Sequence, residues 1–408
     1  MGNDLSTTRP AAETATRKML AYCQANDWAG IDPYDALNSR IFLALPFLDR
    51  RIPRLVMTQA LKRSPFNIRS LMLIPPTQNP KAFGVFLKAS LKLSKLGWPG
   101  ADELVRFFIR KLDEMRSPNM PYWCWGYSFP WQTRTLIVPR ATPNLVCTTF
   151  VADALLDAHE QTGDAQCLKM AASGADYILN DLMWTDGGSV AGFGYPLASM
   201  RHNIHNGNLL GAALFCRVAK HAGEKKFIEP ALKVARFSAS KQHEDGSWAY
   251  GEMPTQKWID NFHTGYNLWG LQSMARSLET TEFDARIKKG FEFYREHFFQ
   301  PDGVAKYYHD KAYPIDIHCV AQSVMSLLAF PEFDGARNER MASGVLSWAL
   351  ENMWSDKGYF YYRVLPYCKI RTSYMRWSQS WMLLALATFL EAAATASQST
   401  QKAAAAGK

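Results

Sequence analysis

The sequence has no uninterrupted run of about 20 apolar residues, so it does not predict a membrane-spanning helix. Its N-terminus lacks the basic and apolar blocks of a secretory signal. The seven cysteines are odd in number and form no CxxC pair, which favours reduced thiols over a disulfide framework. Together these absences lead us to expect a soluble, cytoplasmic protein.

Signatures of several enzyme and binding-protein classes are missing too. There is no HExxH pair and no cysteine cluster with the spacing of a zinc site, so we expect no metal and no cofactor. The net charge of +9 is spread over small basic groups, and no nucleic-acid-binding motif accompanies it. The surplus is compatible with an anionic ligand, whereas nucleic acid is not indicated.

An internal repeat is the main feature that the sequence does have. An Asp-Gly or Asp-Lys-Gly turn signal recurs with spacings of 59, 57 and 54 residues, at Asp186, Asp245, Asp302 and Asp356. A second series runs in step with the first, because His205–Gly211 matches His263–Gly270 with an offset of 58 residues. Two interleaved series with one period predict a repeat architecture.

Each repeat unit contains one apolar and one amphipathic helical pattern. A helix without a charged face belongs inside and one with a charged face belongs outside. Inner helices are expected to begin near residues 82, 148, 206, 264, 318 and 376. Outer helices are expected to begin near residues 101, 165, 226, 284 and 338, and a helix over about 12–26 is the sixth outer partner.

Six such pairs suit a closed ring, which needs no capping repeats. We therefore predict an all-α fold, an (α/α)6 toroid of the six-hairpin type, with long loops forming a polar funnel at one end. A single domain is expected over residues 1–392, with the proline-containing segment 27–75 wrapped on the body as shorter helices. Residues 393–408 are expected to form a disordered tail.

Three histidines stand at matching places near the starts of inner helices, and each is followed three or four residues later by an amide on the same helix face. The positive end of a helix dipole favours a neutral imidazole, which suits a general base. Acidic residues precede two of the histidines. The candidate catalytic residues are Asp260, His263, Asp316, His318 and His205.

Two other interpretations of these residues remain open. The carboxylates can be N-caps, with the histidines hydrogen-bonded in the core. Alternatively, three imidazoles could hold zinc if they converged on one ion, although no further ligand motif supports this.

Aromatic, amide and basic side chains gather in the expected loops. Rings beside Gln, Asn and Arg are typical of sugar binding, and the scarcity of carboxylates among them favours an anionic carbohydrate. Packing of these loops into the ring is the alternative. The candidate substrate-binding residues are Trp125, Tyr127, Trp131, Gln132, Arg134, Arg140, Asn144, Asn208, Trp248, Lys257, Asn261, Asn267, Tyr307, Arg371, Tyr374, Arg376 and Trp377.

Four short runs carry a resemblance to a known family. They are Gly126–Trp131, Thr142–Asn144, Trp258–Leu271 and Tyr313–His318. With them the chain, over roughly residues 75–390, resembles bacterial six-hairpin toroid proteins encoded with exopolysaccharide or lipopolysaccharide biosynthesis genes. The resemblance implies the toroid fold and an association with glycan assembly, including contact with its membrane-bound machinery. It implies no residue roles.

Two classes of function compete at this point. The first is an enzyme that processes a polysaccharide or lipid-linked oligosaccharide. It would act either as an inverting hydrolase with Asp260 and Asp316 as its carboxylate pair, or as a lyase or uronate epimerase that removes a C5 proton. The second is a non-catalytic glycan-binding or scaffolding subunit. Asp245–Trp248 is also similar to a turn of terpene cyclases, but the Asp-rich motifs of those enzymes are missing.

Overall fold

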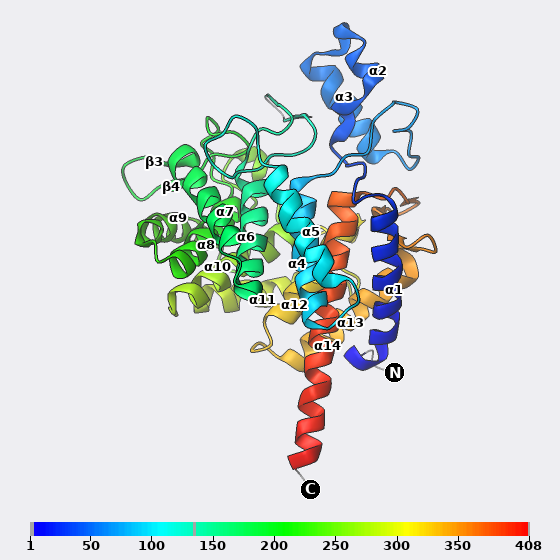
Figure 1. The fold of residues 1–408 in the computed structure, drawn as a ribbon, viewed down its shortest axis with the longest axis vertical. Helices are drawn as coiled ribbons and strands as arrows, with labels where there is room; N and C mark the ends of the chain where they lie inside the picture. Colours follow the sequence, from blue (N-terminus) through cyan, green and yellow to red (C-terminus); the bar gives the residue numbers. More distant parts are fainter. Residues whose placement is uncertain (1–3, 134–135, 407–408) are drawn as a thin grey trace.

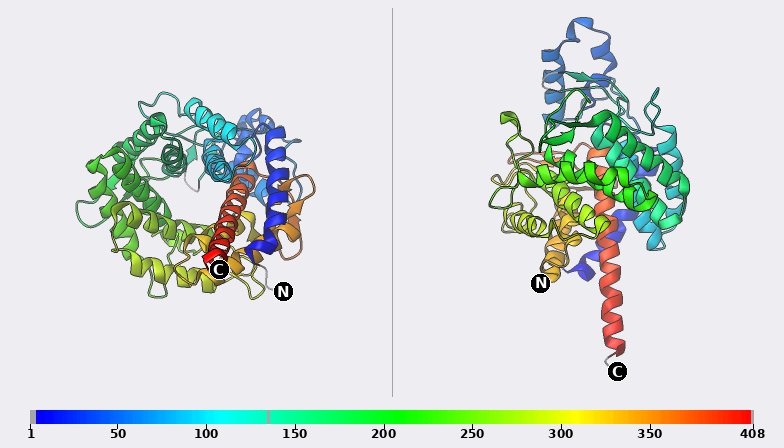
Figure 2. Two further views of the ribbon diagram at one scale, coloured as in Figure 1. Left: turned by 60° about the horizontal axis from the view of Figure 1, so that its bottom comes forward. Right: turned by 90° about the vertical axis from the view of Figure 1, so that its left-hand side faces the viewer.

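Six inner helices form a closed ring in the computed structural model, which describes residues 4–133 and 136–406. Each inner helix packs against the next one along the chain, and the last packs against the first, so the ring has no free end. This confirms the predicted (α/α)6 toroid (Figure 2). The inner helices are α4 Pro80–Lys95, α6 Leu145–Thr162, α8 His205–Ala222, α10 Asn261–Leu278, α12 Ile317–Ala329 and α14 Ser380–Ala406.

Six outer helices surround this ring, and the N-terminal helix packs against α14 as the sixth of them. That helix begins earlier than predicted because Asp4 caps it in a reciprocal capping box with Thr7. The outer helices are α1 Leu5–Ala25, α5 Ala101–Glu114, α7 Ala165–Tyr177, α9 Ile228–Ser240, α11 Asp284–His297 and α13 Gly335–Asn352. Short 3-10 or π turns accompany them at η3 Ile178–Leu182, η4 Lys225–Phe227, η5 Pro254–Gln256 and η6 Met375–Gln379.

The repeated Asp-Gly signals are turns that require glycine. Their glycines all have positive φ, a conformation that side chains disfavour, with values of 87° at Gly187, 95° at Gly246, 85° at Gly303 and 86° at Gly358. Glycine also allows the close approach of two inner helices, since a Cβ on Gly270 of α10 would lie 2.9 Å from the carbonyl oxygen of Leu209 in α8.

Short antiparallel strands join the outer helices to the inner ones, in the long connections that we call the loop end of the ring. β1 pairs with β2, β3 with β4, β6 with β7, and β8 lies between β5 and β9. The strands are β1 Trp131–Gln132, β2 Ile137–Val138, β3 Met183–Thr185, β4 Ala191–Phe193, β5 Ile315–Asp316, β6 Trp354–Ser355, β7 Tyr359–Phe360, β8 Arg363–Val364 and β9 Lys369–Ile370.

The segment predicted to wrap around the body instead stands out beyond the loop end (Figure 1). It does contain short helices, as expected: η1 Asp35–Asn38, α2 Arg40–Leu43, η2 Pro46–Leu48 and α3 Arg51–Arg63. A small core of Ala36, Leu61 and Ile74, separate from that of the ring, holds it together.

The C-terminal segment also differs from the sequence prediction. Helix α14 continues to Ala406, beyond the ring, where a disordered tail was expected (Figures 1 and 2). Alanine, which is frequent there, has the highest helix propensity. By length and composition alone, residues 375–398 could also cross a membrane. In this structure, however, 61% of the apolar 18-residue window in this segment is buried inside the protein.

Candidate functional site

An aspartate–histidine pair opens helix α10 at the loop end. Asp260 is the N-cap, and its Oδ1 accepts a hydrogen bond of 3.0 Å from the backbone N–H of His263. Its Oδ2 accepts from His263 Nδ1 at 2.7 Å and from Trp258 Nε1 at 2.8 Å. A carboxylate only accepts hydrogen bonds, so Nδ1 carries the imidazole proton. Nε2 of the neutral ring is then left with its lone pair, as a general base requires.

One tyrosine contacts His263, whose side chain is 20% exposed, and three more tyrosines lie near that one. The rings of Tyr250 and His263 are 4.6 Å apart, and Tyr34 lies close enough to Tyr195, Tyr250 and Tyr307 to interact electrostatically. All four tyrosines are partly buried. Burial raises the pKa of Tyr250 and of Tyr307 well above 10, so both phenols stay protonated and can donate hydrogen bonds. We call His263 and these four tyrosines the tyrosine cluster.

Asp316 is placed like Asp260, as the N-cap of α12, but its partners differ. Its Oδ2 accepts two hydrogen bonds from Arg363, at 3.0 Å from Nε and 2.6 Å from Nη2. Its Oδ1 accepts from Trp377 Nε1 at 2.9 Å and from the backbone N–H of His318 at 3.0 Å. The side chain is fully buried. This carboxylate supports the loop end and has no oxygen directed at solvent.

His318 is sealed beneath aromatic rings. Its Nδ1 lies 3.2 Å from the carbonyl oxygen of Trp377, and its Nε2 accepts a 2.7 Å hydrogen bond from the hydroxyl of Tyr266. Phe262 and Trp381 pack on its ring. Burial, followed by the charge of Lys81, lowers the pKa of His318 well below 6.5, so this imidazole stays neutral.

His205 points in another direction, toward Ser238 of outer helix α9, with 3.4 Å between Nδ1 and Oγ. Burial lowers its pKa to about 4. The prediction that the three histidines occupy matching positions is therefore wrong. His205, His318 and His263 are the first, second and third residues of their helices, and each step along a helix turns a side chain by about 100°. Three imidazoles so dispersed do not converge as zinc ligands would.

Most of the predicted substrate-binding residues lie inside the loop end. Trp125 donates to the Leu112 carbonyl, and Trp248 to that of Ser238. Arg376 forms a buried ion pair with Asp32 at 2.6 Å. The side chains of Asn144 and Asn208 bond to backbone N–H groups. Also buried are Tyr127, Gln132, Asn261, Asn267, Tyr374 and Trp377.

A smaller group of the predicted binding residues remains accessible. Trp131 and Tyr307 are partly exposed. Lys257, Arg140 and Arg371 are exposed. Arg134 lies outside the described residues. Most of the clustered rings and amides thus pack the loop end, and fewer form a surface that a ligand could reach. Such clusters also occur in packed regions because buried polar groups need hydrogen-bond partners.

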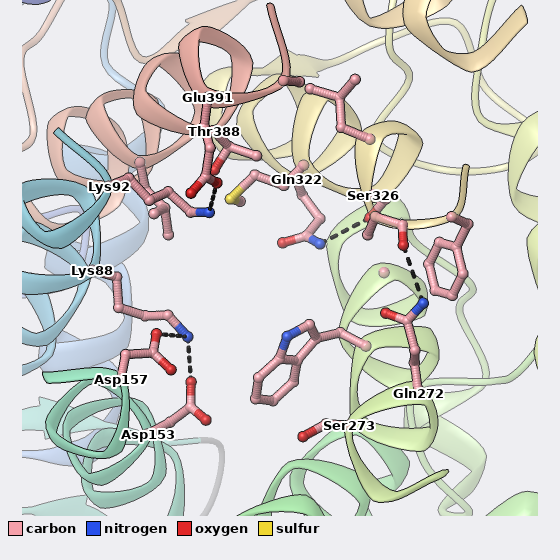
Figure 3. Close-up of a pocket in the computed structure, with 18 of the residues that line it drawn as sticks. Lys88, Lys92, Asp153, Asp157, Gln272, Ser273, Gln322, Ser326, Thr388 and Glu391 are labelled. Atoms are coloured by element: carbon pink, nitrogen blue, oxygen red, sulfur yellow. Dashed lines mark hydrogen bonds and ion pairs between the residues drawn. The ribbon is translucent and has the colours of Figure 1, made fainter. Parts of the chain in front are cut away.

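A cavity of about 1260 Å³ occupies the interior of the ring on the opposite side, between the C-terminal halves of the inner helices (Figure 3). Lys88 forms ion pairs with Asp153 and with Asp157, the latter at 3.1 Å. Arg217 binds the same two carboxylates and Glu160. Although burial alone would raise it, the charges of Lys88 and Arg217 hold the pKa of Asp157 at about 2.

This cavity was not predicted from the sequence, although the sequence contains a signal for it. Lys88, Asp153, Asp157 and Arg217 are charged residues in the middle of helices that are otherwise mostly apolar and buried. Trp269 lies beside Lys88, whose Nζ is 5.2 Å from the centre of the ring. The amides of Gln272 and Gln322 and the hydroxyls of Ser273 and Ser326 complete a lining with both stacking and hydrogen-bonding groups (Figure 3).

Aromatic side chains connect the lining of this cavity to the tyrosine cluster. Tyr266 lines the cavity, and its hydroxyl reaches His318 on the other side. The Tyr266 ring is 6.2 Å from that of His263, and Phe150 and Trp381 pack beside it. Tyr266 therefore lies between the cavity and the two imidazoles of His263 and His318.

No protein-family model and no curated protein matches the sequence. Solved structures share its fold at low identity. A sugar epimerase from a ruminal bacterium is 12% identical with a TM-score of 0.58, over 77% of this chain and 87% of the other. Cellobiose 2-epimerase from Spirochaeta thermophila is 14% identical with a TM-score of 0.59, over 78% of this chain and 86% of the other. Unsaturated glucuronyl hydrolase from Streptococcus agalactiae is 12% identical with a TM-score of 0.57, over 94% of this chain and 92% of the other.

These likenesses confirm that the chain has the six-hairpin toroid fold. The expected link to exopolysaccharide or lipopolysaccharide biosynthesis does not come with them, since a shared fold at such identity carries no function by itself.

Proposed function

We propose that the protein is a carbohydrate-active enzyme that removes a proton from a carbon of its sugar substrate, with His263 as the general base. The observation that carries this proposal is the Asp260–His263 pair, in which the 2.7 Å hydrogen bond from Nδ1 leaves Nε2 as the basic nitrogen of a partly exposed imidazole. Of the three selected histidines, it alone is partly exposed. Sugar epimerases are among the proteins that share the fold, which supports this class of chemistry.

The substrate that fits best is an anionic glycan containing a uronic acid, free or lipid-linked. The carboxylate of a uronate acidifies the neighbouring C5–H, and the neutral phenols of Tyr250 and Tyr307 can donate hydrogen bonds to the enolate that forms. Lys62 Nζ, 2.5 Å from the Tyr34 hydroxyl, supplies positive charge beside the tyrosine cluster. Return of a proton to the opposite face of C5 gives the epimer, whereas loss of the substituent at C4 gives an unsaturated sugar.

Inverting hydrolysis receives less support from the same residues. It needs one protonated carboxyl group and a second carboxylate that activates water. Asp316 is bound to Arg363, and both oxygens of Asp260 already accept hydrogen bonds. Neither is placed to receive a proton from water.

Exchange of the C5 proton with solvent tests the proposal directly. The protein would be incubated with uronate-containing oligosaccharides in deuterated water, and the products followed by NMR for deuterium at C5 or for a C4–C5 double bond. His263→Gln should slow the exchange by about 10²–10⁴-fold. His297→Gln, an exposed histidine on outer helix α11, is the matched control and should leave it unchanged. Equal exchange by both variants would remove His263 from the reaction.

A non-catalytic role in glycan binding is the second candidate, and the large cavity favours it. Trp269 offers a stacking surface beside amides and charged groups, as sugar-binding sites often do. This role predicts that Trp269→Ala weakens binding of an oligosaccharide measured by calorimetry, while no product is formed by either the parent protein or the variant.

A further inference from the structure

The segment that stands out from the loop end is unusually apolar on its outside. We call residues 40–73 the projection. Of the fourteen large apolar side chains that are exposed in the described part of the chain, ten belong to it. Isolated exposed apolar residues are normal, but such a concentration marks an interaction surface. The ten are Ile41, Leu43, Leu45, Phe47, Ile52, Val56, Phe66, Ile68, Leu71 and Leu73.

The projection is also strongly basic. It carries seven arginine or lysine residues against one acidic residue, a net charge of +6 in a chain whose total is +9. The one acidic residue, Asp49, is paired with Arg54 at 2.8 Å. Arg40, Arg50, Arg51 and Arg63 are exposed among the apolar side chains. Exposed apolar side chains and exposed arginines are therefore found together on the projection.

Buried contacts at the base fix the shape of the projection. Arg69 pairs with Asp35 at 2.8 Å and donates to the carbonyl oxygen of Asp32 at 3.1 Å. Arg54 donates to Gln132 of β1 at 3.1 Å. The apolar side chains are thus presented outward by a folded element.

Helix α3 shows the two sides of this element. Thr58 and Leu61 are buried, whereas Ile52 and Val56 are 72% and 62% exposed. Residues four apart lie on one helix face, and Ile52 and Val56 lie opposite the buried pair. One face of α3 therefore holds the element together, and the other has no partner within the described chain.

We infer that the projection docks onto the surface of an anionic lipid bilayer. Short helices with exposed apolar side chains and flanking arginines enter the interface between headgroups and acyl chains, and anionic headgroups attract the basic residues. A second copy of the chain is a poorer occupant, because two surfaces of charge +6 repel each other. Docking would turn the loop end, and with it the tyrosine cluster, toward the membrane (Figure 1). This inference does not depend on the proposed catalysis.

Flotation of the full-length protein with lipid vesicles tests the inference. Vesicles of phosphatidylcholine alone would be compared with vesicles of phosphatidylcholine and phosphatidylglycerol in equal parts. The protein should float with the anionic vesicles and remain largely free with the neutral ones. Arg50→Glu/Arg51→Glu should reduce the partition coefficient by about thirtyfold or more, from the usual contribution of basic residues near such a surface. Ile52→Ser/Val56→Ser should reduce it by at least about tenfold.

Lys288→Glu/Lys289→Glu, on outer helix α11, is the matched control because it makes the same change in net charge at another exposed site. It should bind as the parent protein does, and thermal unfolding would verify that all variants are folded. Equal loss in both charge variants would show that only total charge matters, which overturns the inference. Failure to bind anionic vesicles also overturns it, as does a dimer in gel filtration that Ile52→Ser/Val56→Ser converts to monomer.

Discussion

The buried ion pair between Arg363 and Asp316 allows a structural role to be separated from a catalytic one. Asp316 is 0% exposed and Arg363 is 14% exposed. Arg363→Met removes both guanidinium hydrogen bonds and leaves the carboxylate with two N–H donors and no positive charge. Removing one partner of a buried ion pair costs about 3–5 kcal/mol of stability. For 408 residues, the usual entropy of unfolding converts this into a fall in Tm of about 4–6 °C.

Thermal unfolding followed by circular dichroism would measure this fall for Arg363→Met, for Asp316→Asn and for the double variant. An amide in place of the carboxylate leaves no charge to compensate, so the double variant should have a higher Tm than Arg363→Met alone. An unchanged Tm in Arg363→Met would refute the reasoning. A catalytic Asp316 makes the opposite prediction, namely that Asp316→Asn abolishes turnover while its Tm stays that of the parent protein.

Two further predictions concern stability. Gly270→Ala should lower the free energy of unfolding by about 1–3 kcal/mol, because the new Cβ would press on the Leu209 carbonyl. Gly344→Ala in α13 should raise it by up to about 1 kcal/mol, because a Cβ there meets nothing within 4 Å. Urea denaturation measures both changes. His205 should make the fold sensitive to acid. Its pKa of about 4 lies below the unfolded value of 6.5, so stability is lost as the pH falls from about 6.5 to about 4. The Tm of His205→Gln should fall less than that of the parent protein over this pH interval. An equal fall would contradict the proposed effect of His205 on acid stability.

The sequence was sufficient to predict the architecture because the architecture repeats. The Asp-Gly spacing marks turns whose positive φ favours glycine, and the mostly apolar composition of alternate helices marks which of them lie inside. Five of the six inner helices begin within three residues of the predicted starts, and η6 occupies the predicted start of the sixth. The projection was not predicted, because prolines and apolar residues in short helices do not reveal which body, if any, they pack on.

The site was predicted less well than the fold, since spacing fixes a helix face but not what lies opposite that face. His205 faces Ser238 of an outer helix, and His318 faces Tyr266 and Trp377. The large cavity was overlooked because Lys88 and Asp153 belong to different repeats and meet only when neighbouring inner helices pack together.

The residue bridged to each helix N-cap offers an explanation of why Asp260 and Asp316 have different hydrogen-bond partners. The N-caps Ile204, Asp260 and Asp316 stand at equal spacings of 56 residues, and each pairs with a residue of the next loop. Ile204 bridges Gly251, Asp260 bridges Tyr308, and Asp316 pairs with Arg363. Arg363 donates two hydrogen bonds to the carboxylate of Asp316. Tyr308 has no such charge, and the carboxylate of Asp260 accepts a hydrogen bond from the imidazole of His263 instead. We therefore propose that the residue bridged to the N-cap influences whether its carboxylate binds that residue, as Asp316 does, or an imidazole of its own helix, as Asp260 does.

If so, Tyr308→Arg should break the hydrogen bond between His263 and Asp260 without changing either residue. A guanidinium at position 308 would compete for Asp260, as Arg363 does for Asp316, and His263 Nδ1 would lose its acceptor. The hydrogen-bonded Nδ1 proton should give a separate downfield signal in the proton NMR spectrum of the parent protein and of Tyr308→Phe, and Tyr308→Arg should lack it while retaining its Tm. Persistence of the signal in Tyr308→Arg would mean that the partner strand does not control the pair, and that the difference between Asp260 and Asp316 arises within their own helices.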